Sequence, residues 1–332
     1  MKETKTMHKI LLSIVASFML LFVAACASDV VEEDDSVNED NVPSETVSDD
    51  TGETDYPLVI TDATDTEVTI EEEPEKIISV STSDTETLFA LGLNDEIVGV
   101  SDFDNYPEEA LDKTKVGSVV EPNIEAILEQ EPDLVIVGNS IMPESVEKIR
   151  ELDIPVYQTD PKNMDETVET MTQLAVITNT QQAGEKIVND IEEQLTAITD
   201  TVANVSEEDK KKVYIEFNPG WTVGSGEFMD ELIDLAGGIN IANDQEGWIE
   251  INEEKIIEAD PEYILYADHL IDEETNKPLD ELIKERSGWE EITAIKNDQL
   301  IPLDEDIISR NGPRIIIALQ NIAEGIYPEL FE

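Results

Sequence analysis

The chain has few histidines, cysteines, aromatic residues and basic residues. Of its 332 residues, two are histidines, one is a cysteine and 5% are aromatic, while 79 Asp and Glu stand against 20 Lys and Arg. A single cysteine excludes a disulfide framework and a thiolate metal cluster. His8 and His269 are too few for zinc catalysis with several imidazole ligands, and we expect no metal site.

The formal net charge of −59 restricts the partners of the protein. A polyanion of this size is repelled by phosphate backbones, and the longest basic run is Lys210, Lys211 and Lys212. Nucleic-acid binding is therefore excluded. Such an excess of carboxylates keeps a protein dispersed where salt screens self-repulsion, which suggests a saline or alkaline habitat.

The first 25 residues have the pattern of an export signal. Lys2, Lys5 and Lys9 precede the apolar run ILLSIVASFMLLFVAA, which is short for a membrane-spanning helix. The small residues immediately before Cys26 resemble a bacterial lipobox, and this resemblance implies that Cys26 becomes the lipidated first residue. The alternatives are a plain signal peptide with an incidental cysteine and an uncleaved anchor. We predict a signal peptide over residues 1–25.

An acidic segment without basic residues follows the cysteine. Residues 27–55 contain no lysine or arginine and show neither helical nor strand periodicity. Because this composition cannot bury enough apolar surface to fold, we predict a self-repelling tether over residues 26–55 that holds a folded domain away from a membrane. A calcium-binding tract is the alternative, although the ligand spacing and turn glycine of a known calcium loop are missing.

From Tyr56 onward, short β-rich apolar runs alternate with helical patterns. Ser83 with Glu86 has the pattern of a capping box, and Gly237 is a helix stop signal. The alternation predicts βα units and mostly parallel sheets flanked by helices. The strand candidates are 77–80, 97–100, 134–137, 156–158, 213–217, 263–266 and 300–303, and helix candidates include 83–91, 123–130 and 228–236.

One segment interrupts the alternation. Between residues 181 and 205, apolar side chains recur at spacings of three and four with no internal proline, which predicts one long amphipathic helix. Since βα material lies on both sides, we expect this helix to connect an N-terminal α/β lobe over residues 56–180 with a C-terminal α/β lobe over residues 206–332. The apolar positions are Ala183, Ile187, Ile191, Leu195, Ile198 and Val202.

Two segments of the chain repeat one pattern. EPNIEAILEQEPDLVIVG and EINEEKIIEADPEYILYA align so that Asn123 and Glu125 correspond to Asn252 and Glu254, each pair differing by 129 positions. Pro132 and Pro261 correspond in the same way. The repeat predicts two similar lobes, in which the Asn caps a short helix and the Pro ends it. The alternative is that this order of cap, helix, proline and strand is a common βα pattern.

The sequence contains no recognisable catalytic motif. G-x-S-x-G does not occur as a strand-to-helix elbow, and there is neither a phosphate loop nor a dinucleotide fingerprint. With 79 acidic residues, pairs of carboxylates arise by chance, so no pair indicates a glycosidase. We expect no catalytic residues.

Several segments together resemble one family of transport proteins. The segment from PEKIISVSTSDTETLFALG to EPNIEAILEQEPDLVIVG resembles the N-terminal lobe of the substrate-binding proteins of ABC importers for iron-siderophores, haem and vitamin B12. GSGEFMDELIDLAGGINIA, SGWEEITAIKNDQLIPLDEDIISRNGPRIIIALQNIAE and the ending YPELF resemble the C-terminal lobe. The resemblance covers nearly everything from Tyr56 to Glu332. It implies two α/β lobes joined by one long rigid helix, a ligand cleft between them, and no enzymatic activity.

Within the family, the chain most resembles the cobalamin-binding branch. VSDFDNYP resembles the VSxYxDYP loop of that branch, which implies that Phe103 packs on a corrinoid. Trp248 in GWIEIN falls where a second aromatic residue of the branch is expected, and Trp221 is a third aromatic candidate. Arg310 in SRNGPR falls at a position that faces the ligand in the family. Flat aromatic rings offer stacking to a macrocycle, and an arginine can bond its amide edge. Ordinary core packing is the alternative for Phe103 and Trp248.

The chain departs from that branch at Val119 and Gly138, where cobalamin binders carry further aromatics. A ferric siderophore or haem therefore stays open as the ligand, with His269 or Tyr266 as an iron ligand, although an exposed loop position is the plainer interpretation of His269. An extracellular hydrolase or sensor on the same fold is the alternative from another class of function.

The resemblance also implies the partners of the protein. We expect a monomer, anchored by lipid on the extracytoplasmic face of the cell membrane, that binds its ligand without a covalent cofactor. It would deliver the ligand to a dimeric ABC permease with its ATPase. In the family, one glutamate on each lobe pairs with arginines of the permease, and these glutamates fall on Glu125 and Glu254.

Overall fold

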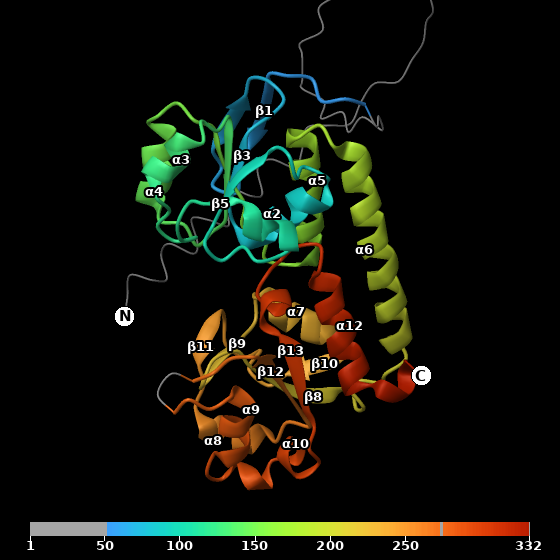
Figure 1. Cartoon of the computed structure of the whole chain (residues 1–332). Coiled ribbons are helices and arrows are strands. Elements are labelled where there is room, and N and C mark those ends of the chain that lie inside the picture. The colour runs from blue at the N-terminus through green and yellow to red at the C-terminus, as the bar shows by residue number, and fades with distance from the viewer. Residues whose placement is uncertain (1–51, 273–274, 332) are drawn as a thin grey trace, which may run out of the picture. The chain divides into compact units, whose positions relative to one another are not determined.

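The computed structural model in Figure 1 describes residues 52–272 and 275–331. Cys26, the predicted signal peptide and most of the predicted tether lie outside the described residues. Within the described part, no helix is both long enough and apolar enough to cross a bilayer. The elements form two parallel sheets with helices around each, as the sequence predicts (Figure 1).

The first sheet has five parallel strands in the order β5-β4-β3-β6-β7. Its two central strands are buried along their whole length, because apolar helices cover both faces. The elements of this half are β1 (Leu58–Thr61), β2 (Glu67–Ile70), β3 (Ile77–Val80), α2 (Thr82–Ala90), β4 (Ile97–Val100), η2 (Glu108–Asp112), β5 (Thr114–Lys115), α3 (Ile124–Glu129), β6 (Leu134–Val137), α4 (Pro143–Arg150), β7 (Val156–Gln158) and α5 (Met164–Ile177).

Strands β1 and β2 form an antiparallel hairpin beside the edge strand β7. The N–H of Ala63, next to this hairpin, donates to the carbonyl of Gln158 at 2.9 Å, so the end of β7 is partly covered. The guanidinium of Arg150 lies 2.7 Å from the buried carboxylate of Asp62. Desolvation raises the pKa of Asp62, but hydrogen bonds from Thr64 and Thr66 and the charge of Arg150 outweigh it and hold that pKa below its usual value.

The second sheet has four parallel strands in the order β10-β8-β12-β13. Arg286 lies across the aromatic face of the buried Trp289 and donates to both oxygens of Glu216, which is fully buried on β8. The elements of this half are β8 (Lys211–Glu216), β9 (Trp221–Val223), α7 (Phe228–Leu235), β10 (Gly238–Asn240), β11 (Trp248–Glu250), α8 (Glu253–Ala259), β12 (Tyr263–Asp268), α9 (Leu279–Glu285), η3 (Trp289–Glu291), α10 (Thr293–Lys296), β13 (Leu300–Asp304), α11 (Glu305–Ile308), α12 (Ile315–Ile326) and η4 (Pro328–Leu330).

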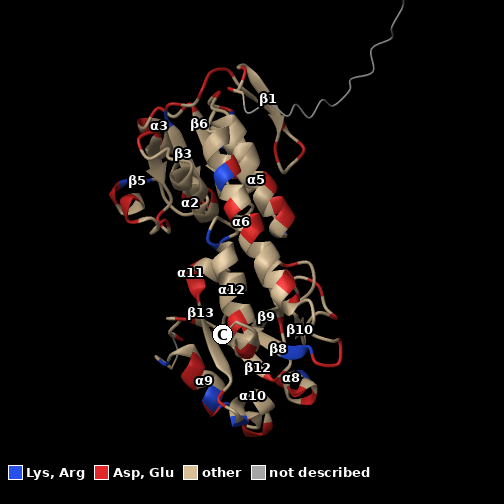
Figure 2. Ribbon diagram, turned by 90° about the vertical axis from the view of Figure 1, so that its right-hand side faces the viewer, with Lys and Arg blue, Asp and Glu red and all other residues tan. Residues whose placement is uncertain are grey.

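Helix α6 (Gln181–Val202) is the long helix that the spacing predicts, and it ends three residues before the expected limit of 205. It packs on α5 of the first half and on α12 of the second, and Ile187 contacts the apolar cores of both halves (Figure 1). In Figure 2 the ribbon of α6 carries several acidic segments, and acidic segments outnumber basic ones over the rest of the described chain. The limits of the two lobes at residues 180 and 206 stay a prediction.

The sequence repeat is also a structural repeat. Strands β4-β3-β6-β7 and β10-β8-β12-β13 are arranged in the same order, with α3 and α8 in equivalent places. Asn123 and Asn252 cap these helices through their side-chain oxygens, as predicted. In each half a residue with positive φ stands directly before the proline: Glu131, two residues after α3, has φ 51°, and Asp260, directly after α8, has φ 50°.

The next residue of the repeat has the same role in both halves. The carboxylate of Asp133 accepts hydrogen bonds from the backbone N–H groups of Glu75 and Lys76, just before β3. The carboxylate of Glu262, 129 positions later, accepts from the N–H of Lys212 on β8 at 3.2 Å. Each carboxylate thus fixes the start of the central strand of its own sheet.

The predicted capping box of Ser83 and Glu86 is wrong. Helix α2 begins two residues earlier than that pattern requires, and its N-cap is Ser81, whose side chain accepts from the N–H of Asp84. Glu86 does not cap the helix, because its carboxylate forms ion pairs with two arginines of the second half. The stop signal at Gly237 is confirmed, since this residue follows α7 with φ 79°.

Candidate functional site

A cavity of about 400 Å³ lies at the carboxyl ends of three neighbouring strands of the first sheet. Its walls include residues 80–83 after β3, residues 138–140 after β6 and residues 159–162 after β7. These strands are adjacent and parallel, so their following loops meet at one edge of the sheet. This is the usual place for a ligand site in a parallel α/β sheet.

The second half of the chain closes the opposite side of the cavity. Glu227 and Phe228 come from the start of α7, Trp248 from β11, and Ser309 and Asn311 from the loop between α11 and α12. The side-chain amide of Asn311 donates to the carbonyl of Pro161 at 2.7 Å, so the two sides are in direct contact. The cavity therefore needs both halves of the chain to form.

Hydroxyl and amide groups dominate the lining. The charged groups in it are Asp160, Lys162 and Glu227, and Lys162 pairs with Asp160 at 2.7 Å. The amide of Asn139 also donates to Asp160, at 2.6 Å. Such a lining can donate to and accept from an uncharged polar ligand without carrying a strong positive field. Its uncharged polar members are Ser81, Thr82, Ser83, Asn139, Ser140, Thr159, Ser309 and Asn311.

A buried acid lies behind the cavity wall. The hydroxyl of Thr159 donates to Asp84 Oδ2 at 2.6 Å, and the N–H of Asp84 donates to the hydroxyl oxygen of Ser81 at 3.4 Å. Desolvation, with a smaller contribution from the charge of Asp104, raises the pKa of Asp84 to about 6, against the lowering effect of the hydrogen bonds with Thr159 and Ser81. Both hydroxyls also line the cavity, so the protonation of Asp84 is coupled to two groups at its surface.

Trp248 is held in one orientation at the cavity. Its indole Nε1 donates to Glu227 Oε2 at 3.1 Å, and Phe217 meets its ring edge-on with the centroids 5.4 Å apart. The side chain stays 43% exposed. A ring that is fixed and still exposed can stack on a bound molecule without further loss of rotamer freedom.

Trp221 is also exposed but does not line the cavity. It lies on β9, opposite Glu250, while Trp248 lies opposite Val223. Strands β9 and β11 form a two-stranded antiparallel sheet. Since side chains two residues apart on a strand share a face, the two tryptophans lie on the same face of this sheet, diagonally across it.

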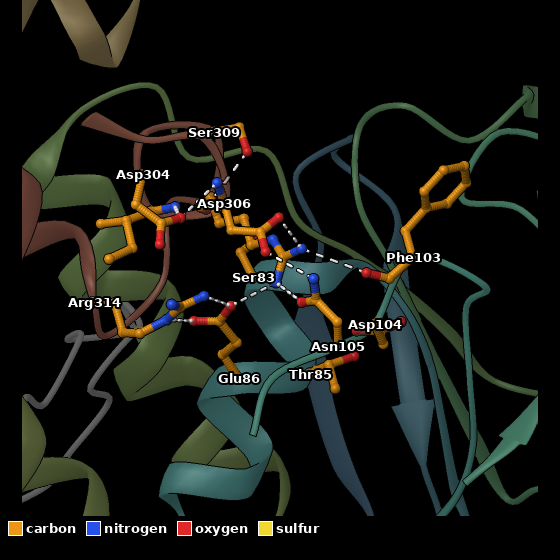
Figure 3. A network of polar contacts seen from close by, with 12 residues as sticks. Ser83, Thr85, Glu86, Phe103, Asp104, Asn105, Asp304, Asp306, Ser309 and Arg314 are labelled. Atoms are coloured by element: carbon orange, nitrogen blue, oxygen red, sulfur yellow. Dashed lines mark hydrogen bonds and ion pairs between the residues drawn. The ribbon is translucent and has the colours of Figure 1, made fainter. Parts of the chain in front are cut away.

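Phe103 lies in the loop after β4, outside the set of residues that line the cavity, and is 57% exposed. Figure 3 shows its ring turned away from the polar network beside it. Val119 and Gly138, where the chain departs from the cobalamin-binding pattern, both line the cavity. A Cβ at position 138 would lie 3.2 Å from the hydroxyl of Ser81, so any side chain there requires Ser81 to shift by a few tenths of an ångström.

Arg310 does not line the cavity, because its guanidinium is buried among acceptors. It donates to Glu86 at 2.9 Å, to the side-chain oxygen of Asn105 at 2.8 Å and to Asp306 at 2.5 Å. A longer bond of 3.4 Å reaches the carbonyl of Phe103. A direct contact of Arg310 with a ligand stays a prediction, and it requires some of these bonds to open.

Arg314 completes this arrangement. It donates two hydrogen bonds to Glu86, and its guanidinium lies 4.0 Å from the centre of the Tyr106 ring. We call the five residues that join the two halves in this way, Glu86, Asn105, Asp306, Arg310 and Arg314, the inter-sheet network (Figure 3).

The remaining predicted residues lie away from the cavity. Glu125 and Glu254 are exposed in the first turns of α3 and α8, and His269 is exposed beside Asp268. Tyr266 is part of β12 and is half-buried. Cys26 is outside the described residues.

The sequence analysis missed the hydroxyl and amide groups of the lining. Ser81, Asn139 and Thr159 carry no motif, and each is a common residue type in loops. The order of the parallel strands could have indicated them, since each follows the carboxyl end of a predicted strand. The inter-sheet network had no such signal, because its two sides are more than 200 positions apart.

The match of a family model covers most of the folded chain. Residues 77–307 match the model described as "Periplasmic binding protein". The uncharacterized ABC transporter substrate-binding lipoprotein YvrC of Bacillus subtilis is 32% identical over 83% of this chain and 88% of its own length. A cobalamin-binding protein of Halobacterium salinarum is 27% identical over 82% of this chain and 74% of its own length. The solved structure of the periplasmic heme-binding protein RhuT from Roseiflexus sp. RS-1 matches with a TM-score of 0.68 and 25% identity, covering 77% of this chain and 99% of that one.

Proposed function

The chain belongs to the periplasmic binding protein family, and from this premise we propose that it captures a corrinoid on the outer side of the cell membrane and delivers it to an ABC importer. That it is a substrate-binding protein of an importer of the vitamin B12, haem and siderophore type follows from the family. The members of this family are binding proteins for transporters and not enzymes. The ligand and the mode of attachment are our proposals.

The chemistry of the cavity lining carries the proposal of a corrinoid. Among the described residues that line it, none is His, Tyr, Met or Cys, the side chains that ligate haem iron. The one lysine among the described residues of the lining is paired with Asp160, which favours an uncharged ligand over the propionates of haem or the acidic groups of a ferric catecholate. A corrinoid carries uncharged amides around its macrocycle, and serine, threonine and asparagine side chains can bond these.

The shape of the site suggests how a corrinoid would lie in it. A volume of about 400 Å³ is near the lower end for ligand pockets, so a macrocycle with several side arms would be enclosed only in part. We expect the flat face of the macrocycle to stack on Trp248. We expect its amide edge to form hydrogen bonds with the hydroxyls that follow β3 and β7. Because Val119 and Gly138 offer no ring, stacking would come from one side only.

Haem or a ferric siderophore is the second candidate. A relative at 25% identity is named as a heme-binding protein, which is the observation in its favour. His269 and Tyr266 lie outside the lining of the cavity, so neither supports haem ligation there.

We also propose the way in which the protein works with the membrane. Cys26 would carry the lipid anchor, and the acidic segment after it would act as the tether. Glu125 and Glu254, exposed at equivalent places of the repeat, would pair with basic groups of a dimeric permease. The related B. subtilis protein is named as a lipoprotein, which supports the anchor.

The visible absorption spectrum of the full-length protein, purified from its own cells, tests the ligand. A corrinoid spectrum is expected, together with saturable binding of cyanocobalamin and no binding of hemin or ferrioxamine B in equilibrium dialysis. A haem or ferric catecholate spectrum, with tight binding of that compound and none of cyanocobalamin, would move the assignment to the second candidate.

A further inference from the structure

The repeat carries more than the two glutamates. One turn after Glu125, Leu128 is 41% exposed, and one turn after Glu254, Ile257 is 37% exposed. The residues directly before them, Ile127 and Ile256, are buried in the two cores. A single exposed aliphatic side chain is ordinary, but here the same position of the repeat is exposed and apolar in both halves.

In each helix the glutamate and the aliphatic residue lie on one face. Residues three apart in a helix are neighbours on its surface, so Glu125 with Leu128 and Glu254 with Ile257 each form a compact pair. We call these four residues the paired patch. Both helices are capped by an asparagine, and in both halves a residue of positive φ precedes the following proline, so the two pairs are presented by similar local structures.

The charges around the paired patch indicate the chemistry of its partner. Glu129 and Glu258 directly follow the two aliphatic residues. Within the described chain, no ion pair and no hydrogen bond of the carboxylate is formed by these two glutamates or by Glu125 and Glu254. On α8, Lys255 is engaged by Asp244, and Arg286 lies 3.7 Å from Glu253. Each half therefore offers an apolar contact among unpaired carboxylates, which suits a basic surface with an apolar centre.

We propose that Leu128 and Ile257 are apolar contact residues of the docking surface and that each inserts into one of two identical membrane subunits of the importer. The proposal rests on the importer function proposed above. Two equivalent pairs on one chain fit two copies of a single subunit related by a twofold axis. A second copy of this chain fits poorly, because its net charge of −59 would repel it.

Glutamates and aliphatic residues would contribute to different steps of docking. Exposed carboxylates steer the encounter and make association sensitive to salt, whereas buried apolar contacts chiefly slow dissociation. Truncation of Leu128 and Ile257 is thus expected to speed dissociation of the complex by about tenfold or more while its salt dependence is retained.

Site-specific photo-crosslinking in membranes of the source cells tests the partner. A photoreactive phenylalanine analogue replaces residue 128 or residue 257 of the full-length chain, and Val59 and Leu330, also exposed and apolar, are replaced in matched controls. Positions 128 and 257 are expected to crosslink the same importer membrane subunit, identified by mass spectrometry, and the controls are not. Crosslinks to two different proteins, to another copy of this chain, to lipid alone or to nothing would overturn the proposal.

A kinetic comparison separates this inference from the proposed function. The L128S/I257S variant is expected to leave the importer faster with unchanged thermal stability, while V59S/L330S behaves as the unchanged protein. Equal dissociation rates for both variants would overturn the inference even where the importer still binds the protein. Failure of cyanocobalamin binding would instead overturn the proposed ligand, since the crosslinking and the dissociation assay with purified importer need no added ligand.

Discussion

Arg314 donates two hydrogen bonds to Glu86 across 228 positions of sequence, from Nε to Oε2 at 2.8 Å and from Nη2 to Oε1 at 2.6 Å. Arg310 donates to the same carboxylate at 2.9 Å. Glu86 is 3% exposed, so one buried carboxylate joins two arginines of the second half to a helix of the first. The two sheets are thus held together by a polar contact next to the ligand cavity.

Removal of the Glu86 carboxylate is expected to destabilise the protein strongly. Glu86→Ala leaves two largely buried guanidinium groups without their shared partner, and breaking a buried pair in this way costs about 3–5 kcal/mol of unfolding free energy. Urea denaturation followed by circular dichroism measures this. Glu192→Ala, on the exposed face of α6, is the matched control. A loss below about 1 kcal/mol would mean that the network contributes little to stability.

Arg314→Lys separates charge from geometry in the same contact. A lysine keeps the charge but cannot donate the two parallel bonds to Glu86 or stack in the same way on Tyr106. We expect a smaller loss of stability than for Glu86→Ala, with a cooperative transition retained. A variant as stable as the natural protein would show that only the charge matters.

Trp248→Ala is expected to weaken cyanocobalamin binding by about 1–3 kcal/mol, because the fixed ring then no longer stacks on the ligand. The same change should remove most of the ligand-induced quenching of tryptophan fluorescence. Trp221→Ala serves as a comparison, since Trp221 is equally exposed but does not line the cavity. A larger loss of binding free energy in Trp221→Ala than in Trp248→Ala would show that the ligand stacks on Trp221 of β9 instead.

Asp84 should make stability depend on pH in a defined window. Burial raises its pKa from 3.8 to about 6, so the native state holds the proton more tightly than the unfolded state. The contribution of protonated Asp84 to the stability of the native state is therefore complete below about pH 4 and is lost as the pH rises through 6. Asp84→Asn keeps an acceptor for Thr159 and should raise the unfolding free energy at pH 8 by about 3 kcal/mol.

Urea titrations at several pH values measure the difference between Asp84→Asn and the natural protein. The gain should shrink steadily from pH 8 to pH 4. Asp200→Asn, an exposed position near the end of α6, corrects for the general effect of one charge less. A gain that is constant across this range would contradict the raised pKa.

The double change Glu125→Ala with Glu254→Ala is expected to abolish uptake and ligand-stimulated ATP hydrolysis by the importer. Both side chains are exposed and make no ion pair or side-chain hydrogen bond within the described chain, so folding and ligand affinity should stay unchanged. Association of the natural protein with the importer should also slow with added salt. Glu192→Ala with Glu208→Ala is the control, and equal uptake in both double variants would exclude docking through these residues.

Cys26→Ser is expected to release the protein from membranes or leave it unprocessed, because the lipid would have no attachment point. Membrane fractionation with mass spectrometry of the mature N-terminus measures the outcome. Continued membrane association after complete removal of the signal would contradict a lipid anchor.

The sequence predicts the elements of this fold well where a local pattern specifies them. Strands 77–80, 97–100, 134–137 and 156–158 coincide with β3, β4, β6 and β7, because continuous β-branched runs are typical of a parallel sheet buried on both faces. The prediction lacks β1 and β2 and also the two-residue β5 and the three-residue β9, β10 and β11. For the shorter four, so few residues establish no period.

The cavity was harder to predict than the fold. Trp248 was found because its loop resembles a known family, whereas the hydroxyls that line the cavity became visible only when the strand order was known. Phe103 and Arg310 were expected to face a ligand, and neither lines the cavity of this structure. The partners that occupy Arg310 come from distant segments, and no local pattern records such contacts.

The chain uses its two kinds of basic residue in different places. It has only four arginines, and each is paired with a buried carboxylate: Arg150 with Asp62, Arg286 with Glu216, and Arg310 and Arg314 with Glu86. Lysines meet acids at exposed sites instead, so salt can screen them, while it hardly reaches the arginine pairs. Rising salinity should therefore relieve the repulsion among surface acids and leave the internal ion pairs intact. A brine would then act on this protein as a stabiliser.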